Sequence, residues 1–333
     1  MTRRIAVLGA GSWGTALAMQ LARMSHNVRL WARDADRARA MERDRVNQRY
    51  LPDSPFPESL TVTSDLEAAC SGAERILVAT PSHAFGETLD RAASFVTAET
   101  GLAWASKGFE PGTGRLLHEV ARESVGPEIP LALITGPSFA REVADALPTA
   151  VTVAATEPDF GHAWAELLHG NNFRAYYTAD LVGAELGGAI KNVLAVACGL
   201  ADGLGLGHNA RAALITRGLA EMRRLGRALG ADDDTLMGLA GIGDLVLTCT
   251  GDQSRNRRLG MALGQGRSVD EAVAEIGQVV EGIKTAEEVM RLAERAGVEM
   301  PIAEQVHGIL FRGWSARKGV QVLMERDLKP ETE

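Results

Sequence analysis

One lysine stands in the middle of a long, glycine-rich and apolar stretch, GAELGGAIKNVLAVACGLADGLGLG (residues 183–207). A lysine in apolar surroundings loses much of its hydration unless it is paired, so an apolar helix seldom carries one without a partner or a purpose. Burial also lowers the pKa of an ammonium toward the range useful for proton transfer. Lys191 is therefore predicted to donate or accept a proton. The alternative is that it reaches solvent from a half-buried helix.

Neighbouring glycines and an acid further along the chain support this prediction. Gly187 and Gly188 each cost a helix about 1 kcal/mol relative to alanine, so close approach of a ligand or of another helix is expected to offset them. Asp244 lies in GLAGIGDLVLTCTG (residues 238–251), after a glycine turn and before an apolar run. It is expected to be partly buried, and Lys191 is the cation expected to pair with it.

A second polar cluster follows directly along the chain. Ser254 is a sound N-cap, and Arg255 and Asn256 come next, so free backbone amides, a hydroxyl, a guanidinium and a carboxamide would converge at one helix start. This combination predicts an anion site for a phosphate group. The alternative is a solvated helix start with incidental arginines, and Arg257 and Arg258 are expected to be of that kind.

Near the N-terminus, RIAVLGAGSWGTALAMQLA (residues 4–22) has the outline of either an export signal or a dinucleotide-binding turn. Gly9, Gly11 and Gly14 interrupt the apolar run, whereas the core of a signal peptide is normally continuous. In a dinucleotide-binding turn the first glycine permits a sharp bend, the second admits the pyrophosphate, and the third lets the helix pack close to the strand. A strand over residues 5–8 followed by such a turn is the preferred interpretation.

The helix after this turn is expected from about Trp13 to Met24. The amides of Ser12 and Trp13 would receive the cofactor phosphates, aided by the helix dipole. The next strand, NVRLWARD (residues 27–34), carries Arg33 where enzymes selective for NAD usually have an acid. Arg33 would therefore face a 2′-phosphate or the adenine, and NADPH is expected to be accepted, alone or beside NADH. A solvated loop arginine is the alternative.

Strand-like apolar runs alternate with helical stretches up to about residue 177. This alternation predicts a parallel sheet covered on both faces, with ligands beyond the carboxyl ends of its strands. After about residue 180 helical spacing replaces it. We expect an α/β Rossmann-type doubly wound domain over 1–180, followed by an all-α domain over 181–333. The strand-like runs are RILVAT (75–80), GLAWAS (101–106), LALITG (131–136), AVTVAA (150–155) and FRAYYT (173–178).

The second half also carries signals of helix starts. One amphipathic helix is expected over residues 208–230. Capping boxes and a proline suited to a first helical turn mark three further starts. These are Ser268-x-x-Glu271, Thr285-x-x-Glu288 and Pro301.

Composition limits the classes of partner. The net charge of −8 and the pI of 5.5 argue against nucleic acid as a binding partner. The chain has no run of about 18 apolar residues, so no insertion into a membrane is predicted. Cys70, Cys198 and Cys249 form no CxxC pair and are expected to be buried thiols of a reducing cytoplasm. The histidines show no metal-ligand spacing, so no metal site is predicted.

These motifs together resemble NAD(P)-dependent glycerol-3-phosphate dehydrogenases of the bacterial type. The resemblance implies a reversible hydride transfer that reduces dihydroxyacetone phosphate to sn-glycerol 3-phosphate for glycerophospholipid biosynthesis, with NAD(P)H as cofactor. It is carried by seven segments in the family's order: GAGSWGTALA, SKG, GPSFAREV, AIKNVLAVACGLADGLGLG, GIGDLVLTC, SRNRRLG and VVEG.

The resemblance also implies roles for individual residues. Lys191 would be the proton donor or acceptor, and the site would draw on both halves of the chain. For Glu281, spacing alone indicates only a helix-start acid, whereas the resemblance places it at the cofactor. The substrate would be held by Lys107, Gly136, Ser138, Lys191, Asp244, Ser254, Arg255 and Asn256. The cofactor would be contacted by Gly9, Gly11, Ser12, Trp13, Gly14, Arg33, Tyr50, Lys107, Ala140, Arg255, Val279 and Glu281.

Two alternatives remain open. The 3-hydroxyacid and 6-phosphogluconate dehydrogenases have an asparagine one turn after the lysine, whereas here Asn192 is adjacent to Lys191 and Ala195 occupies the turn position. A regulator that senses NAD(P)H without chemistry would not need such a lysine. The cofactor preference and the dominant direction of the reaction are not given by the sequence. A homodimer is one assembly to be tested.

Overall fold

The computed structural model describes residues 2–328 and 330–331, which fold into two compact units. The N-terminal unit contains the chain up to Glu110 together with Leu116–Leu181. The C-terminal unit contains the chain from Val182 onward together with Pro111–Arg115. This short segment was predicted to belong to the first half. It belongs to the second because the amide of Gly112 donates to Glu288 Oε1 at 2.7 Å.

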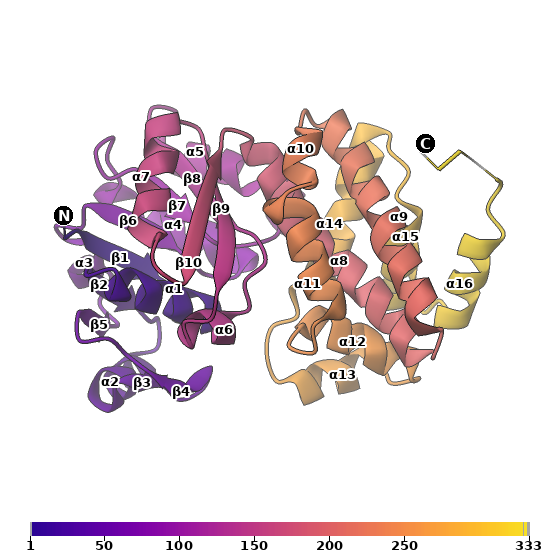
Figure 1. The fold of residues 1–333 in the computed structure, drawn as a ribbon, viewed down its shortest axis with the longest axis horizontal. Coiled ribbons are helices and arrows are strands. Elements are labelled where there is room, and N and C mark those ends of the chain that lie inside the picture. The colour runs from indigo at the N-terminus through magenta and orange to yellow at the C-terminus, as the bar shows by residue number, and fades with distance from the viewer. Residues whose placement is uncertain (1, 329, 332–333) are drawn as a thin grey trace. The chain divides into compact units, whose positions relative to one another are not determined.

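The N-terminal unit is built on an eight-stranded sheet with the order β10-β9-β8-β7-β6-β1-β2-β5 (Figure 1). A separate hairpin pairs β3 with β4. The strands are β1 (Arg4–Leu8), β2 (Asn27–Trp31), β3 (Val46–Asn47), β4 (Leu51–Pro55), β5 (Leu60–Thr63), β6 (Arg75–Val78), β7 (Leu102–Trp104), β8 (Leu131–Thr135), β9 (Thr149–Ala155) and β10 (Phe173–Thr178).

Helices cover both faces of this sheet, as predicted for strands that are apolar on both sides. Ile5 and Val7 of β1 belong to a core shared with α1, α6 and α7, whereas Trp104 of β7 packs edge-on against Phe85 of α4 with ring centroids 5.9 Å apart. The helices are α1 (Ser12–Arg23), α2 (Ala35–Asp44), α3 (Leu66–Cys70), α4 (Phe85–Ala92), α5 (Leu117–Val125), α6 (Ala140–Ala144) and α7 (Pro158–Leu168).

The expectation of a purely parallel sheet is corrected at one position. β8 and β9 pair antiparallel, whereas the other pairings among the described strands of this sheet are parallel. The connection between β8 and β9 contains only the five-residue helix α6, which packs on α1. Such a connection lacks the full helical crossover that usually joins parallel neighbours. The strands expected from the five apolar runs between residues 75 and 178 are all confirmed.

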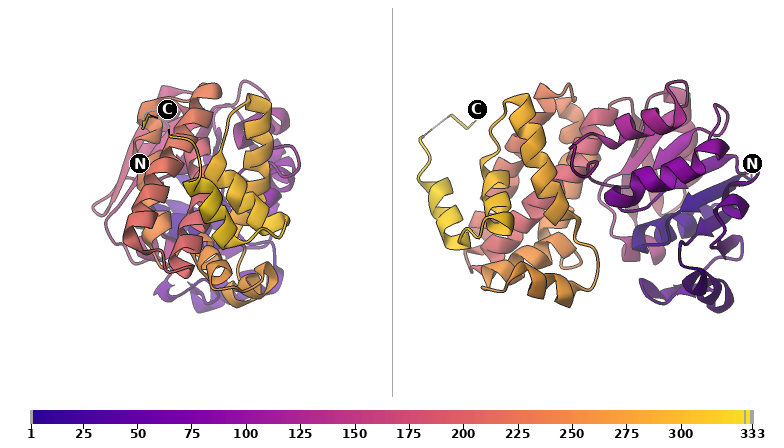
Figure 2. Two further views of the ribbon diagram at one scale, coloured as in Figure 1. Left: turned by 90° about the vertical axis from the view of Figure 1, so that its right-hand side faces the viewer. Right: turned by 180° about the vertical axis from the view of Figure 1, so that it is seen from behind.

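The C-terminal unit is a bundle of helices around α8 (Leu181–Gly203), as two views at right angles show (Figures 1 and 2). α8 is long and apolar enough to cross a membrane by those criteria alone, but 94% of its apolar window is buried inside the protein. The remaining helices are α9 (Gly207–Ala228), α10 (Asp233–Leu236), α11 (Asp244–Thr250), α12 (Arg255–Gly264), α13 (Val269–Ile276), α14 (Glu281–Ala296), α15 (Pro301–Phe311) and α16 (Ala316–Met324).

Two of the three predicted helix starts in this unit are confirmed. Ser268 and Glu271 form the reciprocal bonds of a capping box at α13, and Pro301 opens α15. The capping box predicted at Thr285 is wrong, because α14 already begins at Glu281. The Thr285 hydroxyl donates back to the Glu281 carbonyl at 2.9 Å, the bond of a threonine inside a helix.

Candidate active site

Lys191 is buried in the middle of α8 and is paired. It is 7% exposed, and its Nζ donates to Asp244 Oδ1 at 2.5 Å and to the Thr248 hydroxyl at 3.0 Å. Asp244 is 1% exposed. The predicted pairing of the lysine with this acid is confirmed, and the alternative of a lysine reaching solvent is wrong. In contact, the buried ammonium and the buried carboxylate offset part of each other's desolvation, and removal of either partner would leave the other charge buried and uncompensated.

Asp244 owes its position to an unusual turn. It is the first residue of α11 and follows a π-helical turn, Leu239–Gly243, whose glycines let the chain fold tightly. A Cβ placed on Gly187 of α8 would lie 2.3 Å from the Ala240 carbonyl oxygen of this turn. The close approach predicted near the glycines of α8 is therefore found at Gly187, and the approaching group is the protein backbone.

Thr248 was not singled out by the sequence, yet it completes the contact around the ammonium. It lies four residues after Asp244 on α11, so both side chains project from one face of that helix. Its hydroxyl accepts from Lys191 and donates to the Asp244 main-chain carbonyl at 2.6 Å. The sequence signal that could have identified Thr248 is its i, i+4 spacing from Asp244, an acid already predicted to pair with Lys191.

The start of α12 brings together Ser254 and Arg255, two of the three residues predicted to form an anion site. Ser254 is the N-cap, and its Oγ accepts from the Arg257 amide at 3.2 Å. Arg255 is the first helical residue, and its guanidinium donates to the Val279 carbonyl at 2.8 Å. Glu281 opens α14 two residues after Val279. Four residues predicted to contact the ligands are therefore close together in the C-terminal unit.

Asn256 is held by groups of the protein itself. Its Nδ2 donates to Asn192 Oδ1 at 2.8 Å, and its Oδ1 accepts from the Gly282 amide at 2.9 Å. Asn192 is buried beside Lys191, and its Nδ2 has no hydrogen-bond partner among the described residues. A buried amide nitrogen without a partner is costly unless a ligand or water uses it. Asn192 is thus a candidate ligand-binding residue. From the sequence alone, it was considered only for its position next to Lys191.

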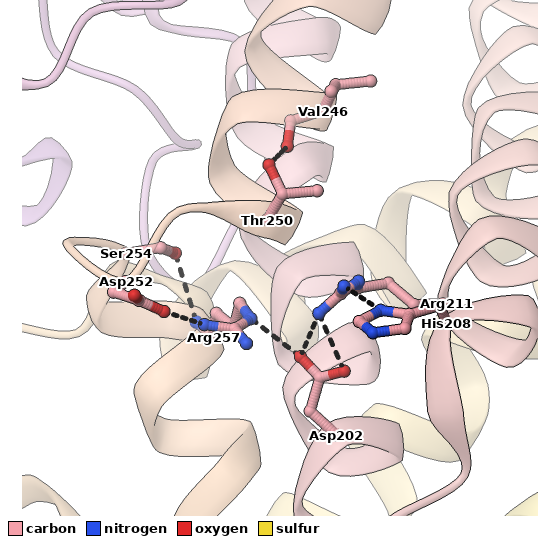
Figure 3. A network of polar contacts seen from close by, with 8 residues as sticks. All are labelled: Asp202, His208, Arg211, Val246, Thr250, Asp252, Ser254 and Arg257. Carbon is pink, nitrogen blue, oxygen red and sulfur yellow. Dashed lines mark hydrogen bonds and ion pairs between the residues drawn. The ribbon is translucent and has the colours of Figure 1, made fainter.

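The expectation that Arg257 is a solvated arginine is wrong. It is 7% exposed, and its guanidinium donates to Asp202 Oδ2 at 2.8 Å and to Asp252 Oδ1 at 2.8 Å (Figure 3). No local pattern indicates this pairing, because Asp202 lies 55 residues earlier, at the end of α8. Arg258, in contrast, is exposed as expected.

In the N-terminal unit Gly9 and Gly14 have the backbone roles predicted for them, and Gly11 has open space beside it. Gly9 has a φ of +123°, and a Cβ there would lie 2.8 Å from the Ala79 carbonyl oxygen. A Cβ on Gly14 would lie 2.0 Å from the Gly9 carbonyl oxygen, so only glycine lets α1 start this close to the turn. A Cβ on Gly11 would meet nothing within 4 Å, which leaves open space beside the backbone.

The first turn of α1 lies at this open space. Gly11 is the N-cap of α1 and gives no side-chain cap, so the first amides, beginning with Ser12 and Trp13, are not capped in this way. The indole Nε1 of Trp13 is buried and has no partner among the described residues. Amides at a helix start, a glycine without obstruction and an unpaired donor fit the phosphates and riboses of a dinucleotide.

Arg33 and Tyr50 lie in the segments that follow the first two strands. Arg33 is exposed, two residues beyond the end of β2. Tyr50 is half-buried between β3 and β4, with the guanidinium carbons of Arg37 and Arg49 at 5.2 and 5.4 Å from its ring centre. Asn47, in the same hairpin, donates to the Ala10 carbonyl at 3.2 Å and so ties this segment to the glycine turn.

Lys107, Gly136 and Ser138 are brought together after the carboxyl ends of β7 and β8. The Gly136 carbonyl accepts from Lys107 Nζ at 3.1 Å and from the Ser138 hydroxyl at 2.9 Å. Gly136 has a φ of +125°, a backbone conformation that favours glycine. Ala140 begins α6 just beyond them. The predicted residues of this unit thus form a polar group at the sheet edge where ligands bind in such folds.

The cysteines are buried thiols. Burial raises the pKa of Cys70 to about 11, and a hydrogen bond with Cys198 together with burial raises the pKa of Cys249 well above its ordinary value. Thiols held in the neutral form are poor nucleophiles, so Cys70 and Cys249 are not candidates for covalent catalysis. Within the described residues, no group of three or more His, Cys, Asp or Glu side chains could hold a metal ion.

Comparison with known proteins extends these observations over the whole chain. A family model for the N-terminus of NAD-dependent glycerol-3-phosphate dehydrogenase matches residues 4–161, and one for its C-terminus matches residues 180–321. The glycerol-3-phosphate dehydrogenase (NAD(P)+) of Stenotrophomonas maltophilia R551-3 is 60% identical over 98% of this chain and 96% of its own length. That of Xanthomonas euvesicatoria pv. vesicatoria 85-10 is 58% identical over 99% and 97%.

Solved structures agree with this result. The crystal structure of glycerol-3-phosphate dehydrogenase from Coxiella burnetii matches with a TM-score of 0.94 at 50% identity, over 98% of this chain and 99% of that one. A ketopantoate reductase from Ralstonia eutropha shares the fold alone, with a TM-score of 0.60 at 15% identity. The matches at high identity cover both units and all seven sequence segments. The chain therefore belongs to the NAD-dependent glycerol-3-phosphate dehydrogenase family.

Proposed function

We propose that this chain is a glycerol-3-phosphate dehydrogenase that uses NAD(P)H to reduce dihydroxyacetone phosphate reversibly to sn-glycerol 3-phosphate. The observation that carries the proposal is the buried ammonium of Lys191 on the predominantly apolar helix α8, where Asp244 of α11 accepts its hydrogen bond at 2.5 Å. Reduction of a ketone needs a proton for the oxygen as well as a hydride for the carbon. A positioned lysine is a suitable donor for that proton.

The residues of the glycine turn fit the cofactor that the family name implies. The amides at the start of α1 would bind the pyrophosphate, the open face of Gly11 would admit it, and Arg33 would meet the adenosine ribose or its phosphate. When bound, the reduced nicotinamide supplies the hydride for the ketone carbon. The dinucleotide contacts proposed for Tyr50, Ala140, Val279 and Glu281 depend on the family resemblance.

Lys191 would hold the proton at Nζ and pass it to the ketone oxygen as the alcohol forms. In the opposite direction the same nitrogen would accept it. Asp244 would compensate the charge of the ammonium and orient it, and Thr248 would fix a second of its three N–H bonds. Asn192, with its unpaired Nδ2, is a second donor for the ketone oxygen.

The phosphate group would be held at the start of α12. Ser254, Arg255 and the first amides of the helix supply a hydroxyl, a guanidinium and oriented N–H groups, which together favour a dianion. By the family resemblance alone, Lys107, which bonds the Gly136 carbonyl, would add positive potential to the substrate. Fixing the phosphate fixes the ketone carbon three atoms away, which is the positioning contribution to catalysis.

The setting of the activity is also part of this proposal. A soluble cytoplasmic enzyme that supplies sn-glycerol 3-phosphate for glycerophospholipid biosynthesis, without insertion into a membrane, accords with the burial of α8. A homodimer is the assembly to be tested, by light scattering of the purified protein. The enzyme would act on a small-molecule substrate and would not bind nucleic acid, in keeping with its net charge of −8.

The test is to mix the purified protein with NADH or NADPH and dihydroxyacetone phosphate, and to follow the loss of nicotinamide absorbance. Oxidation of the cofactor that depends on dihydroxyacetone phosphate is the expected result. Cofactor binding without turnover would point to a sensing regulator instead. Turnover with 3-oxoacids but not with dihydroxyacetone phosphate would point to the 3-hydroxyacid dehydrogenases, and either result would overturn the proposal.

A further inference from the structure

We propose that Arg257 and Asp202 are positioning residues that hold the phosphate-binding start of α12 at a fixed place along α8, the helix that carries Lys191. This inference rests on the proposed function, because it assigns the pair to the alignment of a phosphorylated substrate with the proton donor. Neither residue is expected to touch the substrate itself.

The contacts of the two side chains form one connected network. Arg257 bonds Asp202 through Nε and Asp252 through a terminal nitrogen, each at 2.8 Å (Figure 3). Asp202 also accepts from Arg211 of α9 at 3.1 and 3.2 Å. Arg211 in turn lies 2.6 Å from His208 Nδ1. The carboxylate of Asp202 is therefore shared by two arginines from two different helices.

The polar groups of Arg257 and Asp202 are used in contacts within the protein. Both oxygens of Asp202 accept from guanidinium groups, and its side chain is only 12% exposed. The backbone amide of Arg257 meanwhile donates to Ser254 Oγ and completes the N-cap of α12. One residue thus joins the cap that would face the phosphate to an ion pair that anchors the helix.

α12 lies directly against α8, backbone on backbone. A Cβ on Gly199 of α8 would lie 2.1 Å from the Arg257 carbonyl oxygen, and one on Gly203 would lie 2.2 Å from that of Met261. In the other direction, a Cβ on Gly260 of α12 would lie 2.1 Å from the Val196 carbonyl oxygen. Glycines on both helices thus create a smooth contact, with few side chains there to prevent one helix from sliding along the other.

Two polar tethers fix the position along this smooth contact. Asn256 bonds Asn192, which is adjacent to Lys191. Arg257 bonds Asp202, which is eleven residues beyond Lys191 and therefore about 16 Å further along the helix. Together the two tethers would oppose sliding and pivoting of α12 on α8. Loss of the second tether would leave the helix start tied along α8 through the polar contact of Asn256.

The consequence for the reaction is selective. A displaced helix start would misplace the phosphate, and through it the ketone relative to Lys191, and a displacement of about 1 Å can cost on the order of 10²-fold in rate. A substrate without a phosphate group does not use this helix start. It would therefore be insensitive to the same displacement.

The experiment compares Asp202→Asn with the wild-type enzyme, on dihydroxyacetone phosphate and on unphosphorylated dihydroxyacetone. We expect kcat/KM for the phosphorylated substrate to fall by about 10- to 100-fold, with a raised KM, whereas kcat/KM for dihydroxyacetone stays within about twofold. In an Arg255→Ala background, which already lacks the phosphate contact, Asp202→Asn should cause little further loss. Strong non-additivity of this kind is expected of residues that act through one another.

A matched control removes an ion pair of the same composition elsewhere in the C-terminal unit. Asp233 of α10 bonds Arg223 at 2.9 Å and also pairs with Arg227, both of α9, and Asp233→Asn should leave the ratio of the two kcat/KM values unchanged. If Asp202→Asn does not fold, Arg257→Lys keeps the charge but bonds only one of the two acids. It should show the same selective loss.

Equal loss on both substrates would overturn the inference, as would full additivity with Arg255→Ala or a matching change in Asp233→Asn. A wild-type enzyme without activity on dihydroxyacetone phosphate would instead contradict the proposed function on which the inference rests. The two failures are therefore distinguishable.

Discussion

Lys191 Nζ lies 2.5 Å from Asp244 Oδ1, although the two residues are 53 positions apart in the sequence. The ammonium sits on α8 and the carboxylate on the first turn of α11, and both are buried. A buried lysine would normally favour its neutral form, and the adjacent carboxylate opposes that tendency. The pair therefore keeps a proton available in an apolar environment, which an acid catalyst requires.

Asp244→Asn tests the role of this carboxylate. The change keeps the shape of the side chain but removes the negative charge, so the ammonium form of Lys191 becomes less favoured. We expect turnover in the reducing direction to fall at least about tenfold and to decline at lower pH than in the wild type. The measurement is kcat against pH. An unchanged profile would show that Asp244 does not govern the proton on Lys191.

Arg255→Ala tests the phosphate site. Arg255 opens α12 and its guanidinium is within reach of the Val279 carbonyl, at the same helix start as Ser254. The variant should weaken dihydroxyacetone phosphate far more than an unphosphorylated analogue, because only the phosphate uses the charge-assisted bond. Arg258→Ala, an exposed arginine three residues along the same helix, is the control. Equal loss for both substrates would place the phosphate elsewhere.

Arg33→Ala tests the cofactor preference. Arg33 is exposed just beyond β2, where a guanidinium can meet a 2′-phosphate. We expect the ratio of kcat/KM for NADPH to that for NADH to fall, since only NADPH carries that group. Arg39→Ala, on the adjacent helix α2 and paired with Asp36, removes an equal charge and should leave the ratio as it is. A preference that Arg33→Ala does not alter would make Arg33 a solvated loop residue.

Glu221→Gln tests a structural acid in the C-terminal unit. Glu221 accepts from the Ile302 amide at 2.7 Å and from the Ala303 amide at the start of α15, and burial raises its pKa from 4.5 to about 7. Between these values the folded protein binds the extra proton and the unfolded chain does not, so the free energy of unfolding decreases as pH rises. Below this window the stabilisation is fully present, and above it the stabilisation is fully lost and does not change further with pH.

The measurement is the free energy of unfolding by urea at a series of pH values. Relative to Glu221→Gln, the wild type should lose about 2 kcal/mol between about pH 5 and pH 8, because the glutamine does not titrate. Parallel curves for the two proteins would contradict the raised pKa. The Glu221→Gln substitution is expected to leave kcat and KM unchanged.

The parts of the fold that follow from local sequence were predicted, and the exceptions have identifiable causes. The strand runs between residues 75 and 178 and the glycine turn at Gly9 follow from local periodicity and backbone freedom. The antiparallel pairing of β8 with β9 depends on how α6 packs on α1, which no local pattern encodes. Thr285 satisfied a capping pattern but lies inside a helix that starts one turn earlier.

The same distinction applies to the site. Lys191 and Asp244 stood out because a charge in an apolar segment is unusual whatever its partner. Arg257 lies in a polar segment and gave no such signal, and its burial results from Asp202 on a different helix. Thr248 was missed because a threonine in a helix is common, and only the ammonium 3.0 Å away gives it a role. A local sequence pattern does not identify a contact partner that lies far away along the chain.

The central claim is that Lys191 transfers the proton, and the turnover of Lys191→Ala tests it most directly. We predict that kcat for reduction of dihydroxyacetone phosphate falls by about 10²- to 10⁴-fold. The dissociation constant of NADPH, measured by fluorescence titration, should stay close to that of the wild type. Lys318→Ala, which removes an exposed lysine of α16, should leave both values unchanged. Near-normal turnover of Lys191→Ala would contradict the account.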